Sequence, residues 1–335
     1  MSTMHAINLL KVPSWSSSTV ASTTDLTYNP THPLPVPSPT QLLIRIHATA
    51  ITPYELSWEY PPSATEPRIP CHDIAGVVVS APEDSGFQIG DRVFGLLGFY
   101  GQGGLAEYTV AEEKYLAKIP EGMGFVEAAS LGRAGLTVFE GLRVRNGGVV
   151  REGSKVLVLG ATGAVGRMGV QCIRHWVGAS GKVIAMGGEG TAELKSLGAD
   201  AVFNYREEPN WVDLVKNLGE VDVIFDCVGK KTLEVAIPLV RNGGKIVTIG
   251  SPPPAISGVK GWDEVEKRGD GFFFIVDGDG DLLGEVAGLY EKGVIKASVS
   301  NVVEGLSEKG VQEGWALALK GGVKGKPGTT VVKVL

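Results

Sequence analysis

The chain has 335 residues, 43% of them hydrophobic, which is enough for two sizeable hydrophobic cores. Its net charge of −6 comes without any block of basic residues, which argues against nucleic acid as a partner. No apolar run approaches the roughly 20 residues that a membrane helix needs, so we expect no membrane partner either. Three cysteines form neither a disulfide framework nor a clustered zinc spacing, and we expect a cytoplasmic protein in a reducing compartment.

The first third of the chain is rich in short strands separated by turns. Residues 41–48 alternate apolar and polar side chains, which predicts a half-buried strand with His47 on its solvent face. Further short strands are expected over residues 74–79, 91–95 and 105–110. Frequent turns between short strands are typical of a barrel-like β module.

A glycine-rich turn follows the apolar run Val156–Leu159. The turn carries Gly160, Gly163 and Gly166, and a helix-like segment begins directly after it. Strand, glycine turn and helix in this order indicate a site for a dinucleotide, because the backbone must approach a pyrophosphate closely at the positive end of the helix. The alternative is a glycine-rich loop that binds nothing.

The segments after this turn alternate between strand and helix patterns. Helices are expected over residues 192–197 and 232–240, and strands over 182–187, 201–205, 221–226 and 245–250. Such alternation predicts a parallel sheet covered on both faces, with ligands beyond the carboxyl ends of its strands. Before the glycine turn, residues 125–142 predict a helix. After the alternating segments, the chain predicts an apolar strand over 272–276, helices over 282–291 and 311–319, and a last strand over 330–335.

Several short motifs in a fixed order carry a family resemblance. The chain resembles the medium-chain dehydrogenase/reductase superfamily, on its zinc-free quinone oxidoreductase and enoyl reductase side. The motifs that carry the resemblance, besides the glycine turn, are Pro70–Gly76, Ile89–Gly95, Gly104–Tyr108, Leu116–Pro120, Asp226–Gly229 and Gly243–Gly250.

The resemblance implies an α/β protein with a GroES-like β-barrel module and a Rossmann domain, the latter a doubly wound parallel sheet. The implied domains are a GroES-like catalytic domain over residues 1–130, a dinucleotide-binding domain over 131–273, and a return to the catalytic domain over 274–335. The active site is then expected in the cleft between the two domains.

The resemblance also bears on metal binding. Relatives that use zinc hold it with two cysteines and a histidine, and the matching positions here are Thr52, His72 and Arg133. One ligand of three does not hold zinc, so we expect no metal and a structural, hydrogen-bonded His72. The acidic run Asp277–Asp281 lacks the later residues of a calcium loop and is expected to be a solvated turn.

The implied activity is hydride transfer from NADPH to a quinone or an α,β-unsaturated carbonyl or enoyl substrate. Tyr54 matches the position of the proton-relay hydroxyl, and Arg133 is expected to supply a fixed positive charge that does part of the work of zinc. Tyr100, in a glycine-flanked loop, is not favoured. The alternatives are a zinc alcohol dehydrogenase-like enzyme and a non-catalytic dinucleotide-binding protein.

NADPH is the expected cofactor, with NADH as the alternative because Glu189 lies near the end of the second strand. Residues 61–68 and 251–270 are expected to shape the substrate pocket, and a homodimer through the apolar 272–276 strand is predicted. The expected cofactor contacts are Thr52, Thr137, Gly160, Gly163, Ala164, Val165, Gly166, Gly187, Lys195, Tyr205, Cys227, Val228, Gly229, Ile249, Gly250, Phe273, Phe274, Ile275 and Lys326.

Overall fold

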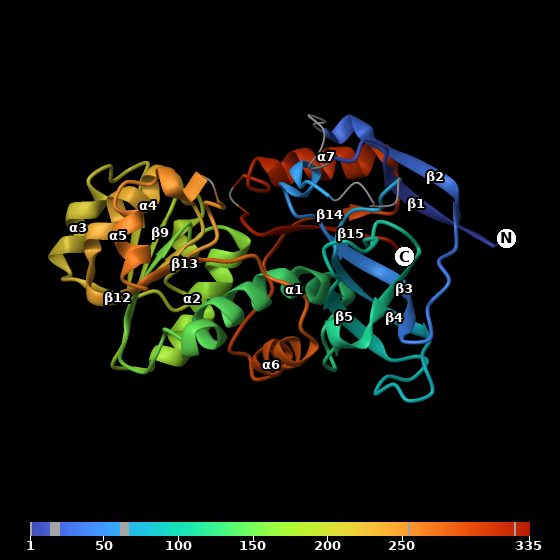
Figure 1. The fold of residues 1–335 in the computed structure, drawn as a ribbon, viewed down its shortest axis with the longest axis horizontal. Coiled ribbons are helices and arrows are strands. Elements are labelled where there is room, and N and C mark those ends of the chain that lie inside the picture. Colours follow the sequence, from blue (N-terminus) through green and yellow to red (C-terminus); the bar gives the residue numbers. More distant parts are fainter. Residues whose placement is uncertain (1, 14–20, 61–66, 254, 325) are drawn as a thin grey trace. The chain divides into compact units, whose positions relative to one another are not determined.

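A computed structural model describes residues 2–13, 21–60, 67–253, 255–324 and 326–335. The chain forms two compact units, coloured along the sequence in Figure 1. Unit 1 comprises Met1–Leu136, Asp277–Lys292 and Ala297–Leu335, and unit 2 comprises Thr137–Val276 with Gly293–Lys296. Among the described residues, no helix combines the length and the apolar composition needed to cross a bilayer.

Unit 1 is built on a mixed sheet of seven strands with the order β14-β15-β3-β4-β5-β7, in which β6 also pairs with β3. A separate hairpin is formed by β1 and β2. The last strand of the chain pairs with β3, so both ends of the chain contribute to unit 1. The strands of unit 1 are β1 (Thr3–Leu9), β2 (Leu26–Pro33), β3 (Gln41–Ala50), β4 (Asp73–Ser80), β5 (Arg92–Leu96), β6 (Tyr108–Glu112), β7 (Leu116–Lys118), β14 (Val299–Glu304) and β15 (Thr329–Lys333).

Strand β3 shows the predicted alternation, with one exception. Leu42, Ile44 and Ile46 are fully buried in the core of unit 1. His47 is half-buried rather than solvent-facing, because its ring stacks on Phe125 with the centroids 4.2 Å apart. Desolvation by this burial, with the nearby arginines, lowers the pKa of His47. The polar face of a strand is therefore not always exposed to solvent.

Unit 1 also contains α-helices, one of which holds the turn after β3. They are α1 (Phe125–Phe139), which continues into unit 2, α6 (Gly280–Glu291) and α7 (Glu308–Leu319). Trp315 of α7 is fully buried, and its Nε1–H donates to the carbonyl of Pro53 at 2.9 Å. This bond ties the turn after β3 to a rigid helix, and that turn carries Thr52 and Glu55.

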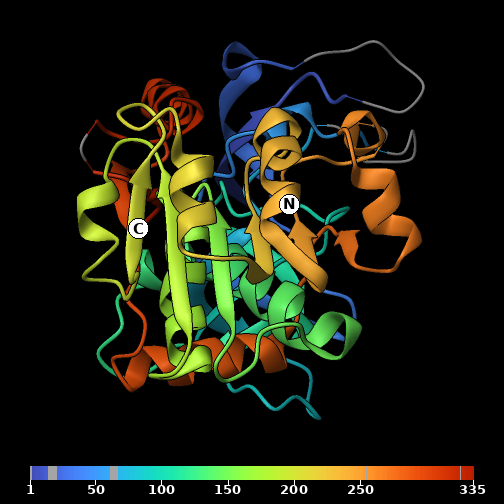
Figure 2. The same cartoon turned by 90° about the vertical axis from the view of Figure 1, so that its left-hand side faces the viewer.

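Unit 2 is a parallel sheet with the strand order β10-β9-β8-β11-β12-β13. In chain order this is 3-2-1-4-5-6, the arrangement of dinucleotide-binding sheets, and Figure 2 shows the helices packed around it. The predicted Rossmann sheet is confirmed. Its elements are β8 (Lys155–Leu159), α2 (Ala164–Val177), β9 (Lys182–Gly187), β10 (Ala201–Asn204), α3 (Trp211–Asn217), β11 (Val221–Asp226), α4 (Lys230–Ala236), β12 (Val240–Thr248), α5 (Trp262–Lys267) and β13 (Gly271–Phe273).

Two expectations about unit 2 differ from the structure. The helix expected over residues 192–197 is only a 3₁₀ turn, Thr191–Glu193, followed by turns up to Gly198, whose φ is positive. The strand expected over 272–276 pairs with β12 only up to Phe273, and the next residue, Phe274, is buried.

The segment after β12 was expected to shape the substrate pocket, and that role stays a prediction, although part of the segment serves the core. Ile256, Val259, Trp262 and Val265 are buried in the hydrophobic core of unit 2, and Trp262 is 1% exposed. The other expected pocket segment, residues 61–68, lies outside the described residues except for its last two members.

Candidate functional site

At two positions in the glycine turn of unit 2, close contacts leave no room for a side chain. Gly160 has a φ of +73°, which favours glycine. A Cβ on Gly166 would lie 2.2 Å from the carbonyl oxygen of Gly160, and a Cβ on Gly160 would lie 2.8 Å from Cγ2 of Val228. These two glycines therefore serve the packing of α2 and of the neighbouring strand end against the turn.

Gly163 has a different role, because it faces open space. It is the N-cap of α2 without a side-chain cap, and the first turn of this helix carries no acidic residue. A Cβ on Gly163 would meet nothing closer than the Gly160 carbonyl oxygen at 3.5 Å. The N–H groups of Ala164, Val165 and Gly166 have no intrahelical acceptor at this end. The turn thus fits the diphosphate of a dinucleotide, which amide groups and the helix dipole would hold.

The ends of β11 and β12 meet beside this turn. Oδ1 of buried Asp226 accepts hydrogen bonds from the N–H groups of Val228 and Gly229, both at 3.0 Å. Its Oδ2 accepts from the hydroxyl of Thr248 at 2.6 Å. Desolvation raises the pKa of Asp226 above its ordinary value. A Cβ on Gly250 would lie 2.3 Å from the carbonyl carbon of Val228, so backbone, not side chains, fills the space between the two strand ends.

The ends of β9 and β10 carry the residues expected to choose between the two nicotinamide cofactors. The ring of Tyr205 lies against Gly188, where an added Cβ would be 3.1 Å from the phenol oxygen. Arg206, which sequence reasoning missed, forms an ion pair with Glu189 at 2.9 Å, and both side chains are exposed. The signal available was a basic residue directly after the predicted tyrosine. Lys195 is exposed on the preceding turn.

The remaining predicted cofactor residues are scattered. Thr137 is buried in α1, Ile249 follows β12, and Phe273 ends β13. The ring of Phe274 is packed against Gly141 and lies 5.0 Å from the guanidinium of Arg145, so this side chain serves the core. Ile275 is 66% exposed. Thr52 and Lys326 belong to unit 1, and their cofactor contacts stay predictions.

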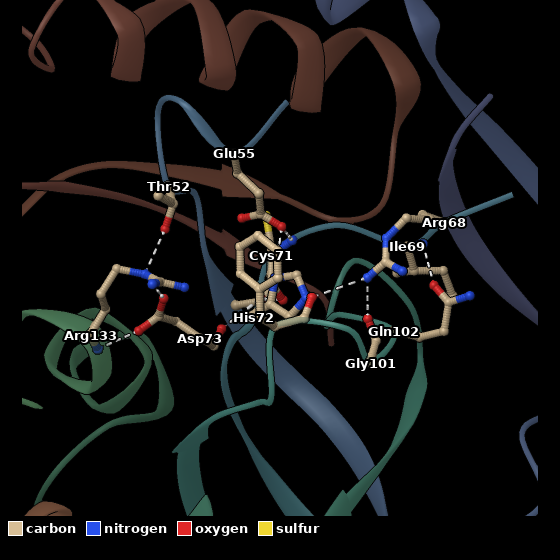
Figure 3. Close-up of polar contacts among 12 residues, drawn as sticks. Thr52, Glu55, Arg68, Ile69, Cys71, His72, Asp73, Gly101, Gln102 and Arg133 are labelled. Atoms are coloured by element: carbon tan, nitrogen blue, oxygen red, sulfur yellow. Dashed lines mark hydrogen bonds and ion pairs between the residues drawn. The ribbon is translucent and has the colours of Figure 1, made fainter. Parts of the chain in front are cut away.

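In unit 1, Arg133 of α1 forms the centre of a polar network, shown in Figure 3. Its Nε–H donates to the hydroxyl of Thr52 at 3.1 Å and lies 3.3 Å from Oδ2 of Asp73. Its backbone N–H donates to Oδ1 of Asp73 at 2.5 Å. A Cβ on Gly132 would lie 2.8 Å from that oxygen, so glycine at this position permits the contact. The guanidinium is thereby held in one orientation.

A second carboxylate holds the segment before β4. Oε1 of Glu55 lies 2.9 Å from Nδ1 of His72 and accepts from the N–H of Cys71 at 2.7 Å. Glu55 and His72 are both 1% exposed, and Cys71 has a φ of 70°, in the left-handed region. His72 is hydrogen-bonded as predicted. Glu55 was missed, because nothing in a lone acid of a loop indicates a buried partner 17 residues away.

The Arg133 network decides how well zinc would fit. Two of the three ligand positions implied by the resemblance are Thr52 and Arg133, and these two are hydrogen-bonded directly to each other. A guanidinium in this place repels a cation and offers no lone pair. The third position, His72, directs Nδ1 to Glu55, and its buried Nε2 has no hydrogen-bond partner in the described part of the chain. The residues present do not fit a zinc ion.

Two tyrosines considered at the sequence level lie apart from this network. The side chain of Tyr54 is 68% exposed and that of Tyr100 is 59% exposed. Tyr54 caps the 3₁₀ turn Glu55–Ser57, and no described side-chain contact joins it to Arg133. The role of Tyr54 as a proton donor stays a prediction.

Comparison with known proteins agrees with this geometry. Residues 38–121 match the alcohol dehydrogenase GroES-like domain, and residues 164–265 match the zinc-binding dehydrogenase domain. Over 227 residues the chain is 33% identical to the quinone oxidoreductase of Homo sapiens, covering 65% of this chain and 67% of that protein. The chain belongs to the medium-chain dehydrogenase/reductase family. Within this family it stands on the zinc-free, quinone oxidoreductase-like side, as the sequence predicted.

Two further relatives extend the comparison. The chloroplastic NADPH-dependent alkenal/one oxidoreductase of Arabidopsis thaliana is 35% identical over 274 residues, which are 77% of this chain and 64% of that protein. The chain thus spans about two thirds of the length of these two curated family members. The structure of the quinone oxidoreductase from Coxiella burnetii superposes with a TM-score of 0.82 at 25% identity, covering 100% of both chains. The predicted GroES-like module with a Rossmann sheet is therefore confirmed.

Proposed function

We propose that this protein is an NADPH-dependent reductase that delivers hydride to a quinone or to an α,β-unsaturated carbonyl or enoyl substrate. The observation that carries the proposal is the guanidinium of Arg133, oriented by Thr52 and Asp73 where zinc-using relatives place metal ligands. The names of the human and Arabidopsis relatives, a quinone oxidoreductase and an alkenal/one oxidoreductase, support the substrate class.

The chemistry asks little of the protein beyond binding and charge stabilisation. NADPH, when bound, supplies the hydride. As hydride reaches the substrate, negative charge develops on the carbonyl oxygen, and a positioned donor stabilises that oxygen. Arg133 provides a permanent positive charge with N–H donors in a fixed fork, which needs no reorganisation during the reaction. Tyr54 or solvent then supplies the proton.

The choice of NADPH rests on the ends of β9 and β10. A 2′-phosphate is a stronger partner for a guanidinium than an exposed carboxylate, so Arg206, now paired with Glu189, would hold the phosphate of a bound NADPH. Tyr205, beside it, offers a hydroxyl to the same group. The name of the Arabidopsis relative supports this preference.

The test of the proposal is a screen with NADPH and NADH against quinones, enones and enoyl thioesters, following cofactor absorbance. Arg133→Met is expected to lower kcat by about 100-fold, the usual loss for one oxyanion donor. Because this change also removes the charged side-chain partner of buried Asp73, the double variant Asp73→Asn with Arg133→Met is the matched control for folding. Full turnover in a folded double variant would contradict the role of Arg133.

The homodimer and the cytoplasmic location remain predictions. Strand β13 is an edge strand of the unit 2 sheet, and an edge with unpaired backbone groups suits pairing with a second copy. The molar mass in solution, from light scattering, tests the homodimer.

A further inference from the structure

Unit 1 contains a continuous run of ring contacts that begins at Arg133. The guanidinium carbon of Arg133 lies 5.0 Å from the ring centroid of Trp58. The rings of Trp58 and Phe99 are 5.0 Å apart, and those of Phe99 and Tyr60 are 5.2 Å apart. The run ends where the guanidinium carbon of Arg68 lies 3.9 Å from the centroid of Tyr60. Three aromatic rings therefore connect two arginines.

Arg68 is the fixed end of this run. Its side chain is 2% exposed, and it donates to the backbone carbonyls of Phe99, Tyr100 and Gly101. No ion pair among the described residues includes Arg68, so carbonyl oxygens and the face of Tyr60 are its observed partners. A buried cation is tolerated only when its donors are satisfied. Arg68 therefore holds the backbone at residues 99–101 in place and, with it, the ring of Phe99.

The opposite end of the run, at Arg133 and Trp58, is partly exposed to solvent. Tyr60 is buried, whereas Trp58 and Phe99 are half-buried and the side chain of Arg133 is 21% exposed. Partly exposed rings thus lie next to an oriented guanidinium. An aromatic contact stabilises beyond its buried area, and a flat conjugated ring can make such a contact while an open chain cannot.

We propose that Trp58 and Phe99 are specificity-determining residues that favour flat conjugated ring carbonyls over open-chain enals. The substrate ring lies against Trp58 and Phe99, its carbonyl oxygen accepts from Arg133, and Arg68 acts as a positioning residue for Phe99. This inference rests on the proposed reductase function and adds to it the residues that discriminate between substrates.

The test compares a flat quinone, menadione, with an open-chain enal, crotonaldehyde, using NADPH. Trp58→Leu and Phe99→Leu are each expected to lower kcat/KM for menadione about tenfold, mainly through KM, and to leave crotonaldehyde within about twofold. Arg68→Met is expected to give a smaller loss in the same direction. Tyr28→Leu, which removes a partly exposed ring elsewhere in unit 1, is the control and should change neither substrate. Equal losses for both substrates, or no loss, would overturn the inference.

A binding measurement separates this inference from the proposed function. Menadione binding to the NADP⁺-bound protein is measured by equilibrium dialysis for the wild type and for Trp58→Leu. If the wild type reduces neither substrate, the reductase proposal fails. Weaker menadione binding in Trp58→Leu then still supports the ring contact, whereas unchanged binding overturns it. Thermal melting shows whether each variant folds. If Arg68→Met does not fold, the ratio of kcat/KM for the two substrates in Phe99→Leu tests the inference instead.

Discussion

The two units carry sites that are built from different materials. The site of unit 2 is made of backbone. Gly160, Gly163 and Gly166 follow one strand within seven positions, and the absence of side chains there lets the backbone pack closely and stay accessible. The site of unit 1 is made of side chains from distant segments, since Arg133 lies 60 positions from Asp73 and 81 from Thr52. A backbone site depends on local sequence, whereas a side-chain site depends on the fold that assembles it.

The largest effect is expected at the centre of the backbone site. In Gly166→Ala the new methyl group would lie 2.2 Å from the Gly160 carbonyl oxygen, so the turn must open. We expect a loss of about 3 kcal/mol in the free energy of unfolding and no measurable NADPH binding. Urea denaturation and calorimetric titration measure the two. Gly284→Ala is the control, because a Cβ there meets nothing within 4 Å. A stable Gly166→Ala variant that binds NADPH would show that the turn tolerates side chains.

The side-chain site should break in a different way. Glu55→Ala removes the acceptor shared by His72 and Cys71 and leaves buried donors unpaired, which costs about 2 kcal/mol. Glu55→Gln keeps an acceptor oxygen of the same shape and is expected to cost less than half as much. Both values come from urea denaturation. If the two variants were equally stable, hydrogen bonding by Glu55 would not be what holds the segment before β4.

A smaller and more selective effect is expected at Gly163. A Cβ there makes only an ordinary contact at 3.5 Å, and the φ of −72° suits alanine, so Gly163→Ala should fold normally. Its methyl group would point into the space where the diphosphate is expected. The Kd for NADPH should rise about tenfold, or 1.4 kcal/mol, with an unchanged melting temperature in the absence of cofactor. Unchanged affinity would place the cofactor elsewhere.

The same contrast explains what the sequence could predict. The glycine turn, the alternation of strands and helices, and hence the Rossmann sheet all follow from residues close together in the chain. Arg133 was found only through a resemblance to relatives, and its bonds to Thr52 and Asp73 needed the fold. Glu55 had no signal at all, because the burial of a lone acid is set by the tertiary structure.

The environment of His47 was predicted wrongly for the same reason. His47 lies on the polar face of β3, but Phe125 from a helix remote in sequence stacks on its ring. In the segment after β12, Trp262 and Val265 complete the core of unit 2, and no local pattern indicated this. In both segments the packing partners are remote in sequence.

The smallest expected effect concerns Asp226, the side chain on which the backbone site of unit 2 depends. Burial raises its pKa in the folded state, so between the ordinary value of 3.8 and the raised value the folded protein binds more protons than the unfolded chain. The free energy of unfolding must then fall as the pH rises through that window, and it levels off above the raised pKa. Asp226→Asn keeps an oxygen that accepts from Val228 and Gly229 but cannot ionise, so the variant should lack this decline. Urea denaturation of both proteins from pH 4 upward measures the difference, which should shift in favour of the variant as the pH rises. A difference that does not change with pH would mean that the two N–H groups and the Thr248 hydroxyl stabilise the Asp226 anion as well as water does. The turn after β11 would then bind an anion even without a cofactor.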